Sequence, residues 1–434
     1  MGIMNLVPPD MFPALAASKL AINAVLEAER QLKDVFARID AVEAVNQWKV
    51  LHAFQKEGIA QRHFAPTTGY GYDDIGRDSL ERVFARALDA EDALVRPQIV
   101  NGTHALYLTL SGLLRSNDTL LCITGKPYDT LEQAIGVKGG VGFGSLHEYG
   151  IGYQEVELKN DMVDLPGVLK ALEDKRIRLV YVQRSRGYAW REAISLTALR
   201  DAFSEIKQIR PDVIIAVDNC YGEFTCTEEP TTVGADVIAG SLIKNPGGGL
   251  APTGGYIAGK AEYVERIAHR LTVPGMGREV GSYAGSYMPF YQGLFLAPHV
   301  TAQSLKSAAL FARTFENAGM VTMPSSLAER SDIIQSLRLP SKEALIAFFQ
   351  SIQKAAPIDS FATPEPWDMP GYSHQVIMAA GTFVQGASIE LSADAPIREP
   401  YIAYIQGALT YAHGRIGAIL ALDALIKSEQ TGGQ

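Results

Sequence analysis

The sequence predicts an α/β fold, in which a large domain built on a mostly parallel sheet is followed by a smaller C-terminal α+β domain. From residue 93 onward, short apolar runs of strand length alternate with stretches of helical periodicity, which is typical of a parallel sheet covered by helices. After about residue 285 this alternation weakens. The 434 residues also exceed one ordinary domain of roughly 100–200 residues.

The N-terminal part is predicted to be helical. Residues 14–57 carry apolar side chains at helical spacing and are rich in Ala, Glu and Lys, which predicts one or two helices. Residues 61–77 are rich in Gly and Asp and predict a loop. A further helix is expected directly after this loop, with Asp78 or Ser79 near its N-cap.

The middle of the chain supplies the strands of the large domain. Strands are predicted within residues 93–100, 119–124, 178–184, 213–219 and 236–243. The helices expected between them include residues 104–114 and 197–207.

The last third is predicted to be mixed. A long helix is expected over 294–318, then a Pro-rich interval over 357–370, and a closing helix over about 401–427. The chain is therefore divided into an N-terminal helical segment (1–65), a large α/β domain (66–285) and a C-terminal α+β domain (286–434).

Composition excludes several classes of protein. The formal net charge is −9 without any basic tract, which argues against a nucleic-acid-binding protein. The longest aliphatic stretches are strand-sized, and the N-terminus does not resemble a signal peptide, so no membrane association is expected. The three cysteines form no CxxC pair and the eight histidines show no ligand spacing, so neither a disulfide framework nor a metal site is expected. These features favour a cytoplasmic location.

A candidate phosphate site follows the first predicted strand. The segment Asn101-Gly102-Thr103-His104 begins a predicted helix. Free N–H groups at a helix N-terminus, a Gly that allows close approach and a Thr hydroxyl suit a phosphate group. The alternative is an ordinary N-cap, in which Asn and Thr are common.

Two ionisable residues follow later strands. Asp218 ends the predicted strand over 213–217, where a carboxylate would face the ligand crevice of a parallel sheet or simply begin a loop. Lys244 stands between apolar residues and a Gly-rich turn. Burial there would lower the pKa of Lys244 and make its amine nucleophilic, as a Schiff base requires, whereas a lone Lys is ordinarily a solvated charge.

In this order and spacing, the three features resemble the aluminium-resistance-protein family, the methionine γ-lyase-like branch of the Cys/Met-metabolism enzymes that depend on pyridoxal 5′-phosphate (PLP). The blocks that carry the resemblance span about residues 67–417. They are TTGYGYDDIGRDSLERVFA (67–85), RPQIVNGTHAL (96–106), VDNCYGEF (217–224), SLIKNPGGGLAPTGGYIAG (241–259) and residues 381–417. The resemblance implies a PLP-dependent transferase-like fold of type I, with PLP as cofactor bound by the large domain.

The resemblance also implies residue roles. Lys244 would bind the cofactor aldehyde and move the proton of the substrate Cα. Asp218 would pair with the pyridine nitrogen, and Gly102, Thr103 and Ser241 would bind the phosphate. Tyr128 is expected to stack on the ring as a catalytic and cofactor-binding residue, although it could also be a turn residue.

A second group of residues resembles a segment that reaches the neighbouring subunit's phosphate in related lyases. It contains Tyr70, Tyr72 and Arg77, and the resemblance implies a homodimer or homotetramer. The spacing differs from the Tyr-x-Arg of those lyases, and Arg77 could equally be a charge at the start of a helix.

Two segments depart from the family pattern. Residues 183–188 replace an Asn-Pro segment, and Glu390-Leu391-Ser392 stands where an Arg-Leu-Ser stretch binds the substrate carboxylate. Arg398 is the nearest candidate for that carboxylate, and Arg415 is a weaker one.

The function implied is a PLP-dependent lyase that eliminates a sulfur leaving group from a small amino acid of the methionine or cystathionine kind. Because the cofactor-binding residues are shared by other PLP reactions, aldol cleavage and transamination stay open. A PLP-binding stress-tolerance protein with little turnover is a further alternative.

Overall fold

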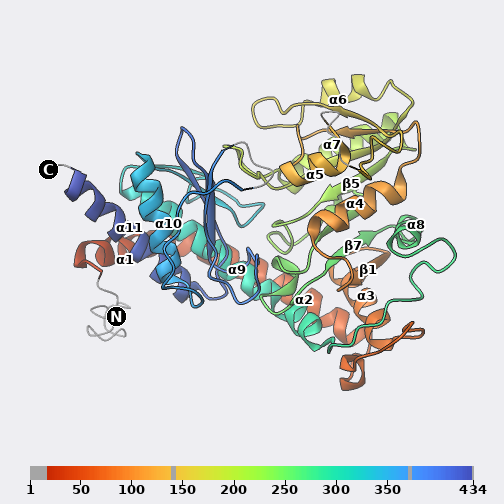
Figure 1. Ribbon diagram of the computed structural model, residues 1–434, viewed down its shortest axis with the longest axis horizontal. Helices are drawn as coiled ribbons and strands as arrows, with labels where there is room; N and C mark the ends of the chain where they lie inside the picture. The colour runs from red at the N-terminus through yellow and green to blue at the C-terminus, as the bar shows by residue number, and fades with distance from the viewer. Residues whose placement is uncertain (1–16, 138–142, 370–373, 433–434) are drawn as a thin grey trace. The chain divides into compact units, whose positions relative to one another are not determined.

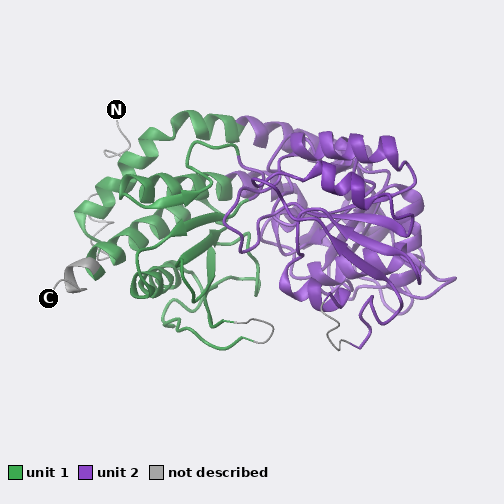
Figure 2. Cartoon of the chain, turned by 90° about the horizontal axis from the view of Figure 1, so that it is seen from above, with its two compact units in different colours: residues 1–40, 303–329, 333–434 green, residues 41–302, 330–332 purple. Residues whose placement is uncertain are grey.

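The computed structural model describes residues 17–137, 143–369 and 374–432 (Figure 1). The expectation about a signal peptide falls largely on residues 1–16, outside this part. The chain forms two compact units (Figure 2). Unit 1 comprises residues 1–40, 303–329 and 333–434, and unit 2 comprises residues 41–302 and 330–332. Both units are discontinuous in sequence, whereas the three predicted segments are continuous, and those segments stay a prediction.

Unit 2 contains a seven-stranded sheet of order β1-β7-β6-β5-β4-β2-β3. Six strands share one direction, and β7 is antiparallel to its neighbours β1 and β6, so the predicted mostly parallel sheet is confirmed. The strands are β1 (Asp92–Arg96), β2 (Thr119–Cys122), β3 (Gly152–Glu155), β4 (Ile177–Gln183), β5 (Ile214–Asp218), β6 (Val237–Ser241) and β7 (Gly255–Gly259).

Helices cover both faces of this sheet. Side chains of α4 (Gly102–Leu113), α5 (Asp129–Ile135) and α8 (Ala261–Leu271) fill the core on one face. Those of α3 (Ile75–Ala87), α6 (Leu165–Ala171) and α7 (Leu196–Ile209) fill the core on the other. Along β5, Ile214 and Ala216 belong to the α4 face, and Ile215 and Val217 belong to the opposite face. A strand buried on both faces needs a continuous apolar run, and this explains residues 213–217.

Unit 1 is built on a five-stranded antiparallel sheet of order β10-β11-β12-β9-β8. The strands are β8 (Val321–Met323), β9 (Gln335–Arg338), β10 (Val376–Ala379), β11 (Ser392–Pro396) and β12 (Ile402–Gln406). Its core also takes side chains from α1 (Lys19–Gln31), α10 (Lys342–Ala355) and α11 (Tyr411–Gly432). Two of the unit boundaries fall within helices, one in α2 (Lys33–Lys56) and one in α9 (Met288–Asn317).

Three predicted element boundaries are wrong. Helix α3 begins at Ile75 with Asp74 as its N-cap, not at Asp78 or Ser79, because the Asp74 carboxylate accepts from the Arg77 N–H at 3.0 Å. Strand β1 ends at Arg96, and residues 97–100 form a turn. The closing helix begins at Tyr411, because residues 402–406 pair with β9 and β11.

None of the helices in the described residues is both long and apolar enough to cross a membrane.

A glycine contact fixes the turn that follows β6. This turn begins with the 3-10 segment η5 (Asn245–Gly247), and its backbone packs against Gly293 of α9. A Cβ built on Gly293 would lie 2.2 Å from the Gly247 carbonyl oxygen, and one built on Gly248 would lie 2.3 Å from the Gly293 carbonyl oxygen. Only glycine permits this approach, and it holds the segment just after Lys244 in place.

We expect Gly293→Ala to lower the free energy of unfolding by about 1–3 kcal/mol, because the added methyl group meets backbone rather than a flexible side chain. In an unconstrained helix interior the same change stabilises by about 1 kcal/mol. Thermal and urea unfolding would measure the effect, with the exposed neighbour Gln292→Ala as control. An unchanged or higher stability for Gly293→Ala would contradict the tight contact.

Candidate active site

The site lies at the carboxyl edge of the unit 2 sheet, where β5 and β6 end. Asp218 is the last residue of β5 and lies opposite Gln183 of β4 in the parallel register. Its side chain is buried, with Oδ1 accepting from the Cys220 N–H at 3.0 Å and Oδ2 from the Tyr181 hydroxyl at 3.4 Å. These bonds fix the Asp218 carboxylate at the edge of the sheet where parallel sheets bind ligands.

Lys244 lies three residues beyond the end of β6. Its Nζ stands 4.0 Å from the centroid of the Tyr221 ring, a cation–π contact. Tyr221 has a positive φ of 71°, a conformation that side chains other than glycine rarely adopt. The backbone is thus held in a strained turn that places an aromatic face beside the amine.

The electrostatics of Lys244 differ from the sequence-based expectation. Burial by itself lowers the pKa of Lys244, but the acidic groups of Cys220, Tyr221 and Asp218 raise it, and the balance leaves it well above its ordinary value. Burial raises the pKa of Asp218, and the Lys244 charge opposes that rise. The predicted lowering of the Lys244 pKa is therefore wrong, because it considered burial alone and neglected Cys220, Tyr221 and Asp218 around the amine.

The N-terminus of α4 lies beside the end of β6. Asn101 is the N-cap, and its side chain accepts from the His104 N–H at 2.9 Å. Within the described chain, the N–H groups of Gly102 and Thr103 have no hydrogen-bond acceptor. A Cβ built on Gly102 would lie 3.3 Å from the Cβ of Ser241. Two free amides, two hydroxyls and a glycine that leaves room fit a phosphate group.

Tyr128 joins the same cluster. Its hydroxyl donates to Thr103 Oγ1 at 2.9 Å, and its N–H donates to Gln183 Oε1 at 2.9 Å. Burial, followed by the charge of Asp218, raises the pKa of Tyr128, so the phenol stays protonated and able to donate. The structure thus brings Gly102, Thr103, Tyr128, Asp218, Ser241 and Lys244 together.

The predicted Tyr–Arg segment forms a separate loop of unit 2. Arg77 is buried, and its guanidinium donates to the Gly71 carbonyl and the Asp78 carboxylate, both at 2.7 Å. Tyr70 and Tyr72 are exposed and stack on each other with ring centroids 5.6 Å apart. Arg77 therefore holds the loop, and the two tyrosines are the groups that the loop presents to the outside.

The candidate carboxylate-binding arginines belong to unit 1. The Arg398 side chain is exposed. Arg415 lies 3.4 Å from Glu29 in an ion pair, so its charge is already partnered. Glu390 accepts from the N–H groups of Phe383 and Val384, both at 2.9 Å, and so serves the local backbone. The role of Arg398 stays a prediction.

Sequence reasoning missed a buried polar network behind the site. Arg184 is fully buried and donates to Asn219 Oδ1 and to the Gly222 carbonyl, both at 2.9 Å. Arg186 forms a buried ion pair with Asp332 at 3.1 Å. Tyr221 and Glu223 were also overlooked. The signal available was residues 183–188, which replace the family's segment. Arg184 in this segment holds the loop that follows β5, and Arg186 pairs with Asp332.

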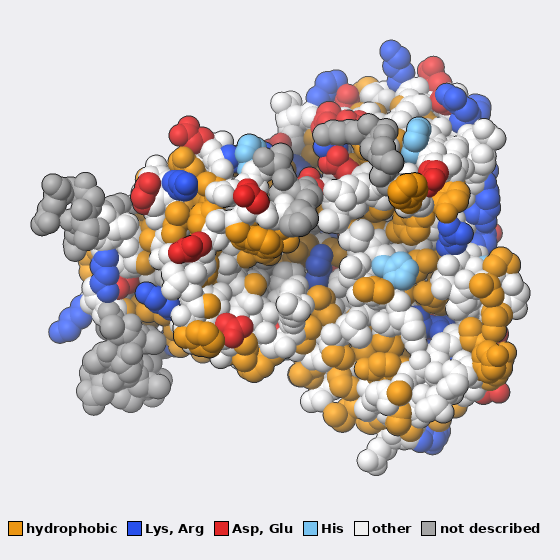
Figure 3. Space-filling view, in the orientation of Figure 1, with side chains coloured by type: hydrophobic (Ala, Val, Ile, Leu, Met, Phe, Trp, Pro, Cys, Tyr) orange, Lys and Arg blue, Asp and Glu red, His pale blue; other side chains and the backbone are white. Residues whose placement is uncertain are grey.

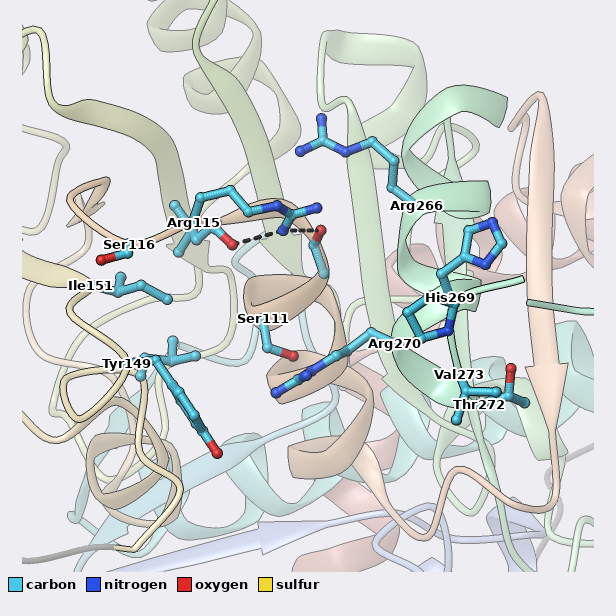
Figure 4. A pocket seen from close by; sticks show the side chains of 14 residues that line it. Ser111, Arg115, Ser116, Tyr149, Ile151, Arg266, His269, Arg270, Thr272 and Val273 are labelled. Atoms are coloured by element: carbon cyan, nitrogen blue, oxygen red, sulfur yellow. Dashed lines mark hydrogen bonds between the residues drawn. The ribbon is translucent and has the colours of Figure 1, made fainter. Parts of the chain in front are cut away.

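A pocket of about 540 Å³ lies at the opposite end of α4 from Gly102 (Figure 4). Arg115 donates to the carbonyls of Gly112 and Leu114, both at 2.8 Å, and Arg266 donates to that of Leu113 at 3.0 Å. Two of its arginines thus satisfy the carboxyl end of the helix. In the part of the chain that the structure describes, no group of three or more His, Cys, Asp or Glu side chains is arranged to bind a metal ion.

The sheet order with one antiparallel strand, together with a lysine beyond β6 and an aspartate ending β5, defines a PLP-dependent transferase-like fold of type I. The PLP-dependent protein YhfS from Escherichia coli has this fold, with 16% identity and a TM-score of 0.62 over 90% of this chain and 97% of that one. So does a cystathionine gamma synthase from Xanthomonas oryzae pv. oryzae, with 14% identity and a TM-score of 0.60 over 85% and 93%.

The chain belongs to the methionine gamma-lyase family, whose model matches residues 21–426. It is 50% identical to a carbon-sulfur lyase involved in aluminum resistance from Clostridium novyi NT, with a TM-score of 0.92 over 95% of this chain and 98% of that one. It is also 49% identical to the uncharacterized protein YnbB of Bacillus subtilis (strain 168), over 96% of this chain and all of that protein. The resemblance stated from the sequence is confirmed.

We expect Arg77→Ala to loosen the Gly69–Asp73 loop and to lower the free energy of unfolding by about 1–3 kcal/mol, since two charge-assisted hydrogen bonds are lost. Hydrogen exchange of the loop amides and thermal unfolding would measure this. Arg86→Ala, an exposed arginine of the same helix, is the control. If Arg77→Ala weakened cofactor retention without loosening the loop, Arg77 would be a phosphate ligand after all.

Proposed function

We propose that this protein is a PLP-dependent amino-acid lyase that breaks a carbon–sulfur bond. The observation that carries the proposal is the meeting of Lys244, Asp218 and the free N-terminus of α4 at one edge of the sheet. PLP, when bound, supplies an electron sink that stabilises negative charge at the Cα of an amino acid.

Each group of the site fits one part of that cofactor. The amides of Gly102 and Thr103, with the hydroxyls of Thr103 and Ser241, would bind the phosphate. Asp218 would hold the pyridine nitrogen protonated, because a buried carboxylate favours a cation beside it. Tyr128 lies between Thr103 and Gln183, where its ring would cover the pyridine.

Lys244 would carry the proton of the reaction. Its Nζ is the group that would hold the cofactor aldehyde, and the amine would be the base that takes the proton from the substrate Cα. The Tyr221 ring covers one side of the amine, and the Lys244 side chain is half-buried. Arg398 is our candidate for the substrate carboxylate.

The sulfur leaving group is proposed from the relatives. The chain is half identical to a carbon-sulfur lyase and belongs to the methionine gamma-lyase family. We therefore propose a methionine- or cystathionine-like substrate. A cytoplasmic location is proposed because all three cysteines are free.

We further propose a homodimer or a homotetramer built from dimers, in which Tyr70 and Tyr72 enter the neighbouring subunit's site. The exposed, stacked tyrosines lie on a loop that their own subunit fixes from within through Arg77. Closed two-fold assemblies would supply this loop to both sites at once.

We expect the purified protein to be yellow and borohydride to fix the cofactor on Lys244, because reduction traps an imine. Asp218→Asn should lower turnover by orders of magnitude while retaining most of the cofactor, because the phosphate groups remain. The exposed Lys159→Ala is the control for the mapping. An adduct on another lysine, or full turnover in Asp218→Asn, would end the proposal.

The reaction itself is tested by incubating the protein with sulfur amino acids and measuring thiol and 2-oxo-acid release. Release of both supports C–S elimination. Amino-group transfer or aldol cleavage without thiol release would indicate another PLP reaction, and cofactor binding without turnover would favour the stress-tolerance role.

Shared sites can be tested by mixing a chain carrying Tyr70→Ala and Tyr72→Ala with a chain carrying Lys244→Ala. If sites are shared, each mixed dimer regains one complete site, so we expect activity to rise well above that of either parent. Mixing with Trp48→Ala in place of the tyrosine variant is the control, since Trp48 is exposed on α2. No gain on mixing, or a monomer in sedimentation, would refute sharing.

A further inference from the structure

A second buried carboxyl group lies behind the candidate site. Glu223 lies in the loop after β5, and its side chain is fully buried. It lies against Gly240 of β6 and Tyr256 of β7, and Tyr256 belongs to the core on the α7 face of the sheet. Tyr181, which contacts Asp218, belongs to the core on the α4 face. The two carboxyl groups therefore lie on opposite faces of the sheet.

Only one of the two carboxyl oxygens of Glu223 has a hydrogen-bond partner among the described residues. Oε1 accepts from the Tyr256 hydroxyl at 2.8 Å, but Oε2 is buried and has no hydrogen-bond partner among the described residues. A Cβ built on Gly240 would lie 2.7 Å from Oε1, so a glycine in β6 is needed for the carboxyl group to fit. A buried carboxylate ordinarily gathers several donors, and one donor suits a neutral carboxylic acid better.

Glu223 is coupled to the lysine through the backbone. Its carbonyl oxygen accepts from the side chain of Asn245, the residue after Lys244, at 3.0 Å. Tyr221, two residues earlier, provides the ring beside the Lys244 amine. Positive φ values at Tyr221 and Phe224, 71° and 59°, show that the segment is held in this conformation at some cost.

The charges around Glu223 come from each neighbouring element. Burial raises the pKa of Glu223 to about 8, while the Tyr256 hydrogen bond and the charge of Lys244 oppose the rise and Glu229 adds to it. Burial raises the pKa of the Cys220 thiol, and the charge of Glu223 adds to that rise. The lysine is thus within electrostatic reach of two buried carboxyl groups, one on each face of the sheet.

We propose that Glu223 is a positioning residue for Lys244, and that only its protonated form supports the reaction. The inference rests on the proposed function. Asp218 already favours the ammonium form of Lys244, and a second buried negative charge would hold that proton still more firmly. The Lys244 amine must be neutral to accept the Cα proton, so a neutral Glu223 side chain keeps the amine available. The backbone carbonyl oxygen of Glu223 holds the Asn245 side chain in place.

The test compares Glu223→Gln with the wild type in the cofactor-loaded protein between pH 6 and 9.5. In the wild type we expect one inflection near pH 8 in kcat and in the cofactor absorbance, and both should vanish in Glu223→Gln, which keeps the shape but cannot ionise. Glu228→Gln, five residues away and exposed in an ion pair with Arg200, should keep the inflection. The same inflection in Glu223→Gln would overturn the proposal.

A second measurement needs neither cofactor nor turnover. Infrared difference spectra should show the carbonyl band of a protonated carboxyl group disappearing near pH 8 in the wild type and absent from Glu223→Gln. Tyr256→Phe should move the transition about one to two pH units higher, because the lost hydrogen bond favours the charged form.

The stability of the protein provides a third readout. The pKa of Glu223 is raised on folding from 4.5 to about 8, so the folded state binds the extra proton between these values and stability falls as pH rises. Glu223→Gln should flatten this slope in Tm. If Glu223→Gln does not fold, the shift of the infrared transition to higher pH in Tyr256→Phe tests the proposal. An unshifted infrared transition in Tyr256→Phe, or none between pH 6 and 9.5 in the wild type, would refute the proposal even if the lyase assay succeeds.

Discussion

The structure depends on placing the half-buried ammonium group of Lys244 within electrostatic reach of the buried carboxylate of Asp218. Burial opposes charge on both Lys244 and Asp218, and each is tolerated because the other is near. That pairing requires β5 and β6 to be parallel neighbours, so that their carboxyl ends meet at one edge. The chemistry we propose follows from this constraint, since the same two groups would act on opposite ends of one aromatic ring.

Glycines and strained turns convert this constraint into a fixed geometry. Gly293 and Gly247 allow helix α9 to support the turn after Lys244, and Gly102 allows the start of α4 to lie close to Ser241. Tyr221 accepts an unfavourable φ to place its ring beside the amine. Glycines such as Gly247 and Gly293, which have no proposed chemistry, therefore help to determine where the reactive atoms lie.

The sequence predicted what local patterns can encode. The apolar run before Asp218 predicted a strand of the parallel sheet, which the structure shows to be buried on both faces. Gly102-Thr103 after a strand predicted a helix N-terminus with free amides. It could not show contacts between distant segments. Asp74, the N-cap of α3, also accepts from the Tyr287 hydroxyl, 213 residues later, and the buried Arg77 donates to the Gly71 carbonyl of its own loop. The pKa of Lys244 depends on a neighbouring strand, and Glu223 gave no signal because its partner Tyr256 is 33 residues away.

The discontinuity of unit 1 has a consequence for synthesis on the ribosome. The Ser18 amide before α1 donates to Asp423 of α11, 405 residues later. At about 5–20 residues per second, roughly 20–80 s separate the emergence of these partners. During that time Ile22, Val25 and Leu26 of α1 lack the helix that covers them. Unit 2 is complete at residue 332, 91 residues before Asp423, and so its core can form first while the nascent N-terminal helix still needs protection from aggregation.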